Sequence, residues 1–421
     1  MTLVMTLVFS LLLILAVPVG YALIISSTAA IIAVGEVPAT VALLKLFQQT
    51  QSFPLIAIPF FILAGALMMT GQMGEHLIEF ANRLVARYRG GLGQATVVGA
   101  TVFGGVSGSA VASASALGSI MIPWQRRAGY PAPFCAALNS SAPIIDLMIP
   151  PSIPMILYAL VSNVSIGALF LAGVLPGLLL AVAFLAVCNI VARVREFPYS
   201  PPTQLDRRTL LRGVLWALPS LLMPVFIVIT LRFGIATPTE VSIIACAYAL
   251  VVSGLIYRDL NLKRIYVSIL STGVITGVIM LVIMGSAPMG WIMTFDDIPS
   301  VFADWARETL QSKWLIILAM NVIMLVIGTF LDLPPAILLL GPIFVPLAEE
   351  IGLDLVQLGL IMVLNCAIGL YTPPVGTTLF VSCSIAGVTM GSTLKDLAPF
   401  LIASLLVLLA ISYIPALTLH F

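Results

Sequence analysis

Long apolar runs separated by short polar connections dominate the chain. A membrane span needs about 20 predominantly apolar residues, so runs of this length predict membrane helices. Residues 3–34 form either one long span or two short ones. The other clear spans cover residues 53–71, 166–192, 214–231, 239–257, 266–290 and 397–418.

Four further apolar segments are interrupted by Gly, Ser or Pro, and they cover residues 94–123, 132–163, 314–346 and 355–390. Backbone groups freed at such interruptions must be buried in protein or face a polar cavity. We interpret the first and third segments as re-entrant hairpins and the other two as broken helices. The amphipathic segments 72–88 and 296–311 are expected to lie at the two membrane surfaces.

Basic residues indicate how these segments are oriented. Arginines flank segment 94–123 on both sides, whereas acidic residues flank segment 314–346. Further basic clusters lie in residues 193–212 and 258–264. By the positive-inside rule these basic loops are cytoplasmic. The first hairpin is therefore expected to enter from the cytoplasm and the second from the opposite face.

The chain also contains an internal repeat at an offset near 223 residues. Gly118-Ser-Ile-Met-Ile-Pro123 matches Gly341-Pro-Ile-Phe-Val-Pro346, and Pro150-Pro151 matches Pro373-Pro374. Because the two hairpins enter from opposite faces, the repeats are inverted. Inverted repeats with broken helices place substrate and coupling-ion sites near the membrane midplane.

Composition supports a membrane protein and excludes several function classes. The chain of 421 residues is 61% hydrophobic and 8% charged, with a mean hydropathy of +1.18. Soluble domains carry roughly 25% charged residues. The 18 basic and 17 acidic residues form no basic surface, so nucleic acid is not an expected partner. The N-terminus lacks a basic region typical of a signal peptide, and we interpret it as a retained helix.

No motif for catalysis or metal binding is present. The five cysteines are dispersed in apolar runs and are interpreted as small core residues. Neither His76 nor His420 has metal-ligand or catalytic neighbours in the sequence. No nucleophile–base pair, zinc pattern or Walker A motif occurs. We therefore predict no catalytic residue, no resident metal centre and no enzyme activity, so that energy comes from an ion gradient or another subunit.

The hairpin tips and helix breaks contain oxygen-rich residues suited to Na+, a hard cation. Exposed carbonyls at unwound helix ends favour cations. The predicted first Na+ site comprises Gly105, Ser107, Ser109, Asp146, Ile149 and Ser152. The predicted second Na+ site comprises Gly328, Asp332, Gly369, Thr372 and Val375. The substrate is expected to contact Ser109, Ser113, Asn139, Ser140 and Asn365.

Asp146 and Asp332 are the acidic residues within the interrupted segments. An ionisable residue at membrane depth is by default a functional hypothesis. The alternative is that each carboxylate only solvates an aqueous cavity or a hairpin tip. For the small residues at the tips, the alternative is close helix packing.

Three stretches resemble one known family. They are Gly104-Gly-Val-Ser-Gly-Ser-Ala-Val-Ala-Ser113, Ile149-Pro-Pro-Ser-Ile-Pro154 and Thr372-Pro-Pro-Val-Gly376. They are similar to the large membrane subunit (DctM-like) of tripartite ATP-independent periplasmic (TRAP) transporters. The resemblance implies Na+-coupled import of an organic acid across the bacterial inner membrane. It also implies a small membrane subunit and a periplasmic substrate-binding protein as partners, and no cofactor beyond the coupling Na+.

The implied fold is an all-α integral membrane bundle of about 11–12 helical segments, with an elevator-type scaffold and transport domain. Residues 1–90 are expected to form N-terminal scaffold helices and a cytoplasmic arm, and residues 193–313 central scaffold helices and a second arm. Residues 91–192 and 314–421 are expected to form the two repeat cores.

Two departures from the family pattern leave the coupling ion of the first site open. The family often has an acid at the position of Ser113 and a small residue at that of Asp146. A carboxylate has thus moved from hairpin to broken helix, and a proton could replace one Na+. The alternative function is a stand-alone ion-coupled dicarboxylate or citrate carrier, which needs no binding protein.

Overall fold

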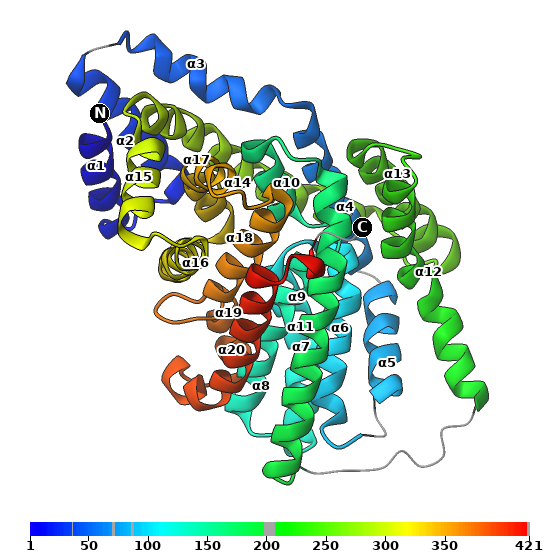
Figure 1. Cartoon of the computed structure of the whole chain (residues 1–421). Helices are drawn as coiled ribbons and strands as arrows, with labels where there is room; N and C mark the ends of the chain where they lie inside the picture. The colour runs from blue at the N-terminus through cyan, green and yellow to red at the C-terminus, as the bar shows by residue number, and fades with distance from the viewer. Residues whose placement is uncertain (36, 70–71, 86–87, 198–206, 419–421) are drawn as a thin grey trace.

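The computed structural model describes residues 1–35, 37–69, 72–85, 88–197 and 207–418, except for the side chains of residues 75, 105–107 and 207–213 (Figure 1). Across these residues the fold is helical, and no strand occurs. His420 and the Pro-rich stretch 198–202, interpreted from the sequence as a loop between the two halves, both lie wholly outside the described residues.

The first half of the chain begins with short helices and leads into the first hairpin and broken helix. Its helices are α1 (Thr2–Ile14), α2 (Val19–Val34), α3 (Thr40–Gln48), α4 (Ala57–Met69), α5 (Gln72–Val85), α6 (Gly91–Ser107), α7 (Ala110–Arg127), α8 (Ala132–Ser141), α9 (Ile145–Met148), α10 (Ile153–Ser162) and α11 (Ile166–Val194).

The second half contains the longest helix and the second hairpin and broken helix. Its helices are α12 (Arg207–Arg232), α13 (Pro238–Val251), α14 (Leu262–Phe295), α15 (Ile298–Leu310), α16 (Lys313–Phe330), α17 (Leu333–Glu350), α18 (Leu355–Gly369), α19 (Thr377–Ala386) and α20 (Met390–Tyr413). Seven described helices are long and apolar enough to cross a membrane, or up to nine if each bent pair counts as one span.

Several sequence expectations are refined by these bounds. Residues 3–34 form two short helices, α1 and α2, since Pro18 begins the second one as its N-cap. Helix α3 was not predicted, because its nine residues are too short and too mixed in polarity to indicate a span. It leads through a sharp bend of 62° into α4.

The first hairpin turns at a glycine, and the second turns at an extended pair. Gly108 has a φ of +59°, a left-handed conformation that glycine adopts without steric cost. Ser109 then caps α7 by accepting a hydrogen bond from the amide of Ala112. In the second hairpin, Leu331 and Asp332 are extended, and α17 begins with proline in its first turn, where a missing amide is tolerated.

Proline pairs interrupt both broken helices. The Pro150–Pro151 and Pro373–Pro374 peptide bonds are both cis. Proline lacks an amide donor, so the helical hydrogen-bond ladder cannot continue through either pair. The helix of residues 132–148 bends by 48° where it passes into α10. Breaks at both expected segments are therefore confirmed.

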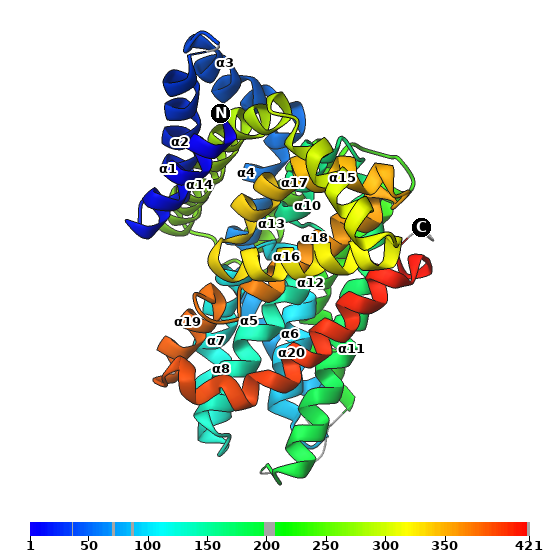
Figure 2. The same ribbon diagram turned by 60° about the vertical axis from the view of Figure 1, so that its left-hand side comes forward.

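The starts and ends of the helices repeat at the same offset as the sequence motifs of the internal repeat. Helix α7 starts and ends at Ala110 and Arg127, and α17 starts and ends 223 residues later at Leu333 and Glu350. Helix α8 likewise starts 223 residues before α18. Figure 2 shows α3 at one end of the molecule and the ends of α8 and α11 at the other.

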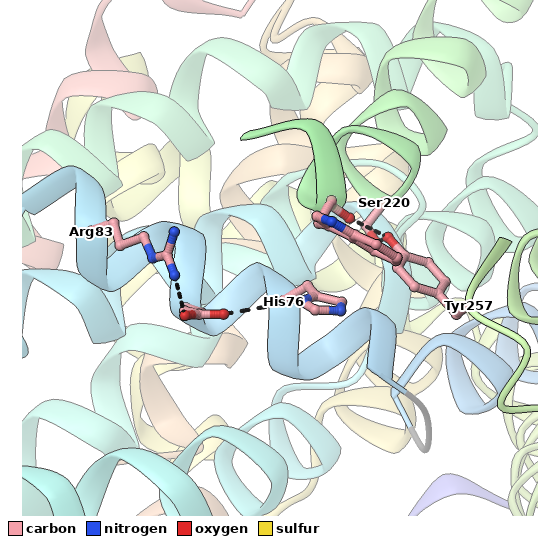
Figure 3. Close-up of polar contacts among 6 residues, drawn as sticks. His76, Arg83, Ser220 and Tyr257 are labelled. Atoms are coloured by element: carbon pink, nitrogen blue, oxygen red, sulfur yellow. Dashed lines mark hydrogen bonds and ion pairs between the residues drawn. The ribbon is translucent and has the colours of Figure 1, made fainter. Parts of the chain in front are cut away.

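Helix α5 packs its amphipathic surface on α6 and α12. His76 lies 5.3 Å from Trp216 and 5.5 Å from Tyr257 between ring centroids (Figure 3). On the same helix Glu79 pairs with Arg83 at 2.5 Å. His76 is thus a stacking residue at a helix interface.

All five cysteines are free and buried, which confirms their interpretation as core residues. The start of α20 is fixed to the end of α11 by an ion pair between Arg195 and Asp396. Because α11 and α20 occupy equivalent places in the two repeats, this contact joins the two halves directly.

Candidate functional site

The tip of the first hairpin lies directly against the break in the first broken helix. A Cβ atom at Gly104 would be 2.8 Å from the Cα of Asp146, and one at Gly108 would be 3.1 Å from the carbonyl oxygen of Pro151. Such distances leave no room for a side chain at either of these two positions. The structure therefore brings together the two segments predicted to form the first ion site.

Asp146 is the central polar group at this junction. Its side chain is fully buried, and neither carboxylate oxygen has a hydrogen-bond partner among the described residues. Ser113 of α7 faces the carboxylate and interacts with it electrostatically. A buried carboxylate that faces only a neutral hydroxyl is costly unless a cation compensates its charge. The carboxylate on the broken helix thus lies opposite Ser113, the hairpin position at which the family often has an acid.

The other predicted ligands of the first site differ in burial and in their position on the helices. The Ser152 hydroxyl is buried and donates to the carbonyl of Leu147 at 2.6 Å, so its oxygen can still accept. Ile149 ends α9 and is half-buried, and Ser109 begins α7. Gly105 has no side chain, and the side chain of Ser107 lies outside those the structure describes.

In the second half, the hairpin approaches the broken helix more closely. A Cβ atom at Gly369 would lie only 2.1 Å from the carbonyl oxygen of Gly328. Thr372 lies just beyond, and its hydroxyl donates to the carbonyl of Ile368 at 2.7 Å. Two predicted members, Gly328 and Gly369, are therefore in contact, and Thr372 is close to them in the chain.

Asp332 and Val375 differ from this pattern. Both are exposed on the chain surface, Val375 by 46%. Among the described residues, no side-chain hydrogen bond or ion pair joins either one to Gly369 or Thr372. The exposed position of Asp332 follows from its place at the N-terminal end of α17, at the hairpin turn.

The two asparagines predicted to contact substrate occupy equivalent places in the two repeats. Asn139 donates to the Ala114 carbonyl at 2.8 Å and to the Ser382 hydroxyl at 2.9 Å. Asn365 donates to the side-chain oxygen of Asn321 at 2.7 Å. The amide oxygens of Asn139 and Asn365 are buried and have no partner among the described residues. In this orientation they can accept hydrogen bonds or bind a cation, but they cannot donate to a carboxylate.

Helix α19 contributes residues that the sequence analysis missed. Thr378 donates to the carbonyl of Ser140 at 2.9 Å, and Ser382 accepts from Asn139. The hydroxyl of Thr377 is buried without a partner among the described residues. Ser140, a predicted substrate contact, uses its own hydroxyl on the Ala137 carbonyl. The available signal was the hydroxyl-rich run that directly follows the second proline pair.

Comparison with protein families gives a match over residues 6–417 to the tripartite ATP-independent periplasmic transporter, DctM component. The chain belongs to this TRAP family. It is therefore a multi-pass membrane protein of the inner membrane that functions in secondary transport and is not an enzyme. A tripartite transporter has three components, and this permease is the large membrane one.

Relatives match this permease along most of their length. It is 54% identical over 420 residues to the uncharacterized protein y4mL of Sinorhizobium fredii, covering 100% of both chains. It is 40% identical over 376 residues to the C4-dicarboxylate TRAP transporter large permease protein DctM of Pseudomonas aeruginosa, covering 89% of this chain and 88% of the relative.

The fold also matches a solved transporter. The crystal structure of the Alcanivorax borkumensis YdaH transporter superposes with a TM-score of 0.58, covering 87% of the permease and 86% of YdaH. Sequence identity is 13%. At this identity the likeness concerns the fold alone.

Proposed function

We propose that the permease imports an organic acid anion coupled to Na+, with one Na+ site in each repeat. The observation that carries this proposal is the fully buried carboxylate of Asp146, which faces the Ser113 hydroxyl but forms no hydrogen bond of standard geometry with the described residues. A monovalent cation would neutralise this charge within an otherwise apolar junction. Asp146, Ile149, Ser152 and Ser109 would hold it, together with the tip residues Gly105 and Ser107.

The second Na+ site would be formed by neutral oxygens. The Gly328 carbonyl lies against Gly369, and the Thr372 hydroxyl is next in the chain. Carbonyl and hydroxyl oxygens are the ligands that hard cations prefer. Asp332 and Val375 would take part only after the exposed tip region closes over the site. This difference predicts that the two sites bind Na+ with different affinities.

The organic anion would bind between the two clusters, near Ser109, Ser113, Asn139, Ser140 and Asn365. Helix N-termini favour anions, and α7 begins next to Ser109. The proposed chemical class of the anion, an organic acid, is supported by the Pseudomonas relative, which is named for C4-dicarboxylates. Sugar acids and 2-oxo acids share the carboxylate and belong to the same proposal.

The mechanism we propose is an elevator, in which the two repeat cores move as one body. Hydrogen bonds from Thr378 to Ser140 and from Asn139 to Ser382 join α19 to α8. The ion pair of Arg195 with Asp396 adds a third link between the halves. A unit connected in this way can carry substrate and ions together past α2, α4, α13 and α14.

The experiment is uptake into proteoliposomes that contain the permease, its small membrane subunit and the cognate binding protein. Radiolabelled succinate, N-acetylneuraminate and pyruvate are tested separately. An inward Na+ gradient is compared with K+ and proton gradients. We expect uptake of one anion that requires both Na+ and the binding protein. Uptake driven by protons alone contradicts the Na+ coupling, and uptake without the binding protein favours the stand-alone carrier.

A further inference from the structure

A polar cavity of about 450 Å³ lies between the end of α3, α14 and the end of α10. Its polar lining comes from the end of α3 and the connection to α4, and consists of Lys45, Gln48, Gln49, Gln51 and Ser52. Trp291 of α14 and Leu160 of α10 form the other walls. Cavities that bind small molecules in proteins typically measure about 300–1,000 Å³.

The cavity lies on the face opposite the basic loops. Helix α14, which is 34 residues long, begins beside Lys263 and Arg264, and Trp291 lies near its other end, in the last turns before Phe295. The broken helix that starts after Arg127 at α8 ends near Leu160 in α10. The ends of α14 and α10 that line the cavity therefore both lie on the side of the membrane opposite the basic loops. By the positive-inside rule this side is the periplasm. Figure 1 shows α3 at the end of the molecule away from α8.

The chemistry of the lining suits a carboxylate. Lys45 donates to the side-chain oxygen of Gln48 at 3.2 Å, and no carboxylate among the described residues lies within ion-pair distance of it. An ammonium group has three donors, so two are left for a ligand. The neighbouring glutamine amides provide further donors.

A second cavity of about 330 Å³ is lined by Arg307 and Lys313, whose side chains have partners of their own. Arg307 forms an ion pair with Glu350, and Lys313 donates to the Gly352 carbonyl at 2.6 Å. Among the described residues, the cavity beside Lys45 is therefore distinguished by a lining that contains a cation and no acidic residue, whereas Glu350 lines the cavity of Arg307 and Lys313.

We propose that this cavity is a periplasmic access site that binds the carboxylate of the organic acid before it reaches the two ion clusters. The carboxylate would bind Lys45 and the surrounding amides, with its carbon chain against Trp291. The identity of this anion as the transported substrate rests on the proposed function. Because α10 belongs to the proposed mobile unit and α3 and α14 do not, movement of that unit would open or close the cavity.

The test uses a cysteine reporter in the full-length permease, held with its small subunit in phosphatidylcholine nanodiscs. All five native cysteines are buried, so Ser52→Cys should be the main reactive thiol. Its labelling rate with a cationic methanethiosulfonate reagent is measured against succinate, N-acetylneuraminate and pyruvate. The exposed Gln51→Cys serves as a second reporter if the first does not react. We expect at least one carboxylate to slow labelling in a saturable manner.

Paired variants identify the group responsible. Lys45→Gln should raise the half-protecting concentration about tenfold or more, whereas Lys313→Gln should change it less than twofold. Absence of protection by all three acids at both reporters overturns the proposal. Protection by added phosphatidylglycerol and not by the acids also overturns it, since the cavity would then bind lipid headgroups. This assay needs no ion gradient, so uptake by the wild-type transporter separately tests the proposed function.

Discussion

At the residue scale, one pair of equivalent positions explains how the two ion clusters differ. Asp146 and Gly369 both follow an asparagine on a broken helix and both lie against a hairpin tip. At Gly369 the carbonyl of Gly328 occupies the place of a side chain, so only glycine fits. At Asp146 a whole carboxylate is accommodated and fully buried. The first cluster therefore carries a fixed negative charge that the second lacks.

Asp146→Asn should weaken Na+ binding without disturbing the fold. The amide has nearly the same shape but removes the charge that a cation would compensate. We expect the Na+ concentration for half-maximal uptake to rise about tenfold, equivalent to about 1.4 kcal/mol. The exposed Asp304→Asn on α15 is the matched control and should leave it unchanged. If the Na+ concentration for half-maximal uptake is the same in both variants, Asp146 does not bind the coupling ion.

Gly369→Ala should disrupt the second cluster by steric overlap. The new Cβ would lie 2.1 Å from a backbone oxygen, which cannot move without shifting the hairpin. Overpacking of this kind costs about 1–3 kcal/mol or more. Gly391→Ala is the control, because a Cβ there meets no atom within 4 Å. Thermal unfolding in detergent should show a clear loss for the first variant only, and equal melting curves would contradict this contact.

At the element scale, the interruptions in the sequence predicted the architecture better than the apolar runs did. Gly108 and the two proline pairs correctly indicated hairpins and breaks, since only certain residues fit a left-handed turn or end a helix ladder. Helix α3 escaped prediction because its nine residues carry no comparable signal. The partners of Thr378 and Asn139 were also beyond reach, because they depend on which helices pack together.

Thr378→Val tests the link between α19 and α8. Valine keeps the shape but removes the buried hydroxyl that the carbonyls of Ser140 and Leu370 share, each at 2.9 Å. An unsatisfied buried polar group costs about 1–3 kcal/mol. We expect a lower melting temperature, whereas the exposed Thr6→Val on α1 should have little effect. If the two variants have the same melting temperature, the hydrogen bond between α19 and α8 does not contribute to stability.

At the scale of the whole molecule, charge and repeat together set the sidedness. The last turn of α7 carries Arg126 and Arg127, and α15 carries Asp304 and Glu308. In right-side-out preparations, Asp304→Cys should react with a membrane-impermeant maleimide, and Arg127→Cys should react only after permeabilisation. The buried native cysteines keep the background low. The reverse labelling pattern would contradict the assigned orientation and the periplasmic position of the cavity beside Lys45.

The central claim is that each repeat provides one Na+ site at the contact of its hairpin tip and helix break. The most direct test is equilibrium binding of radioactive Na+ to the purified permease with its small subunit. We predict that Asp146→Asn and Thr372→Ala each remove part of the specific binding and that the double variant removes nearly all of it. Binding that persists in the well-folded double variant would place the coupling ions elsewhere and contradict the account.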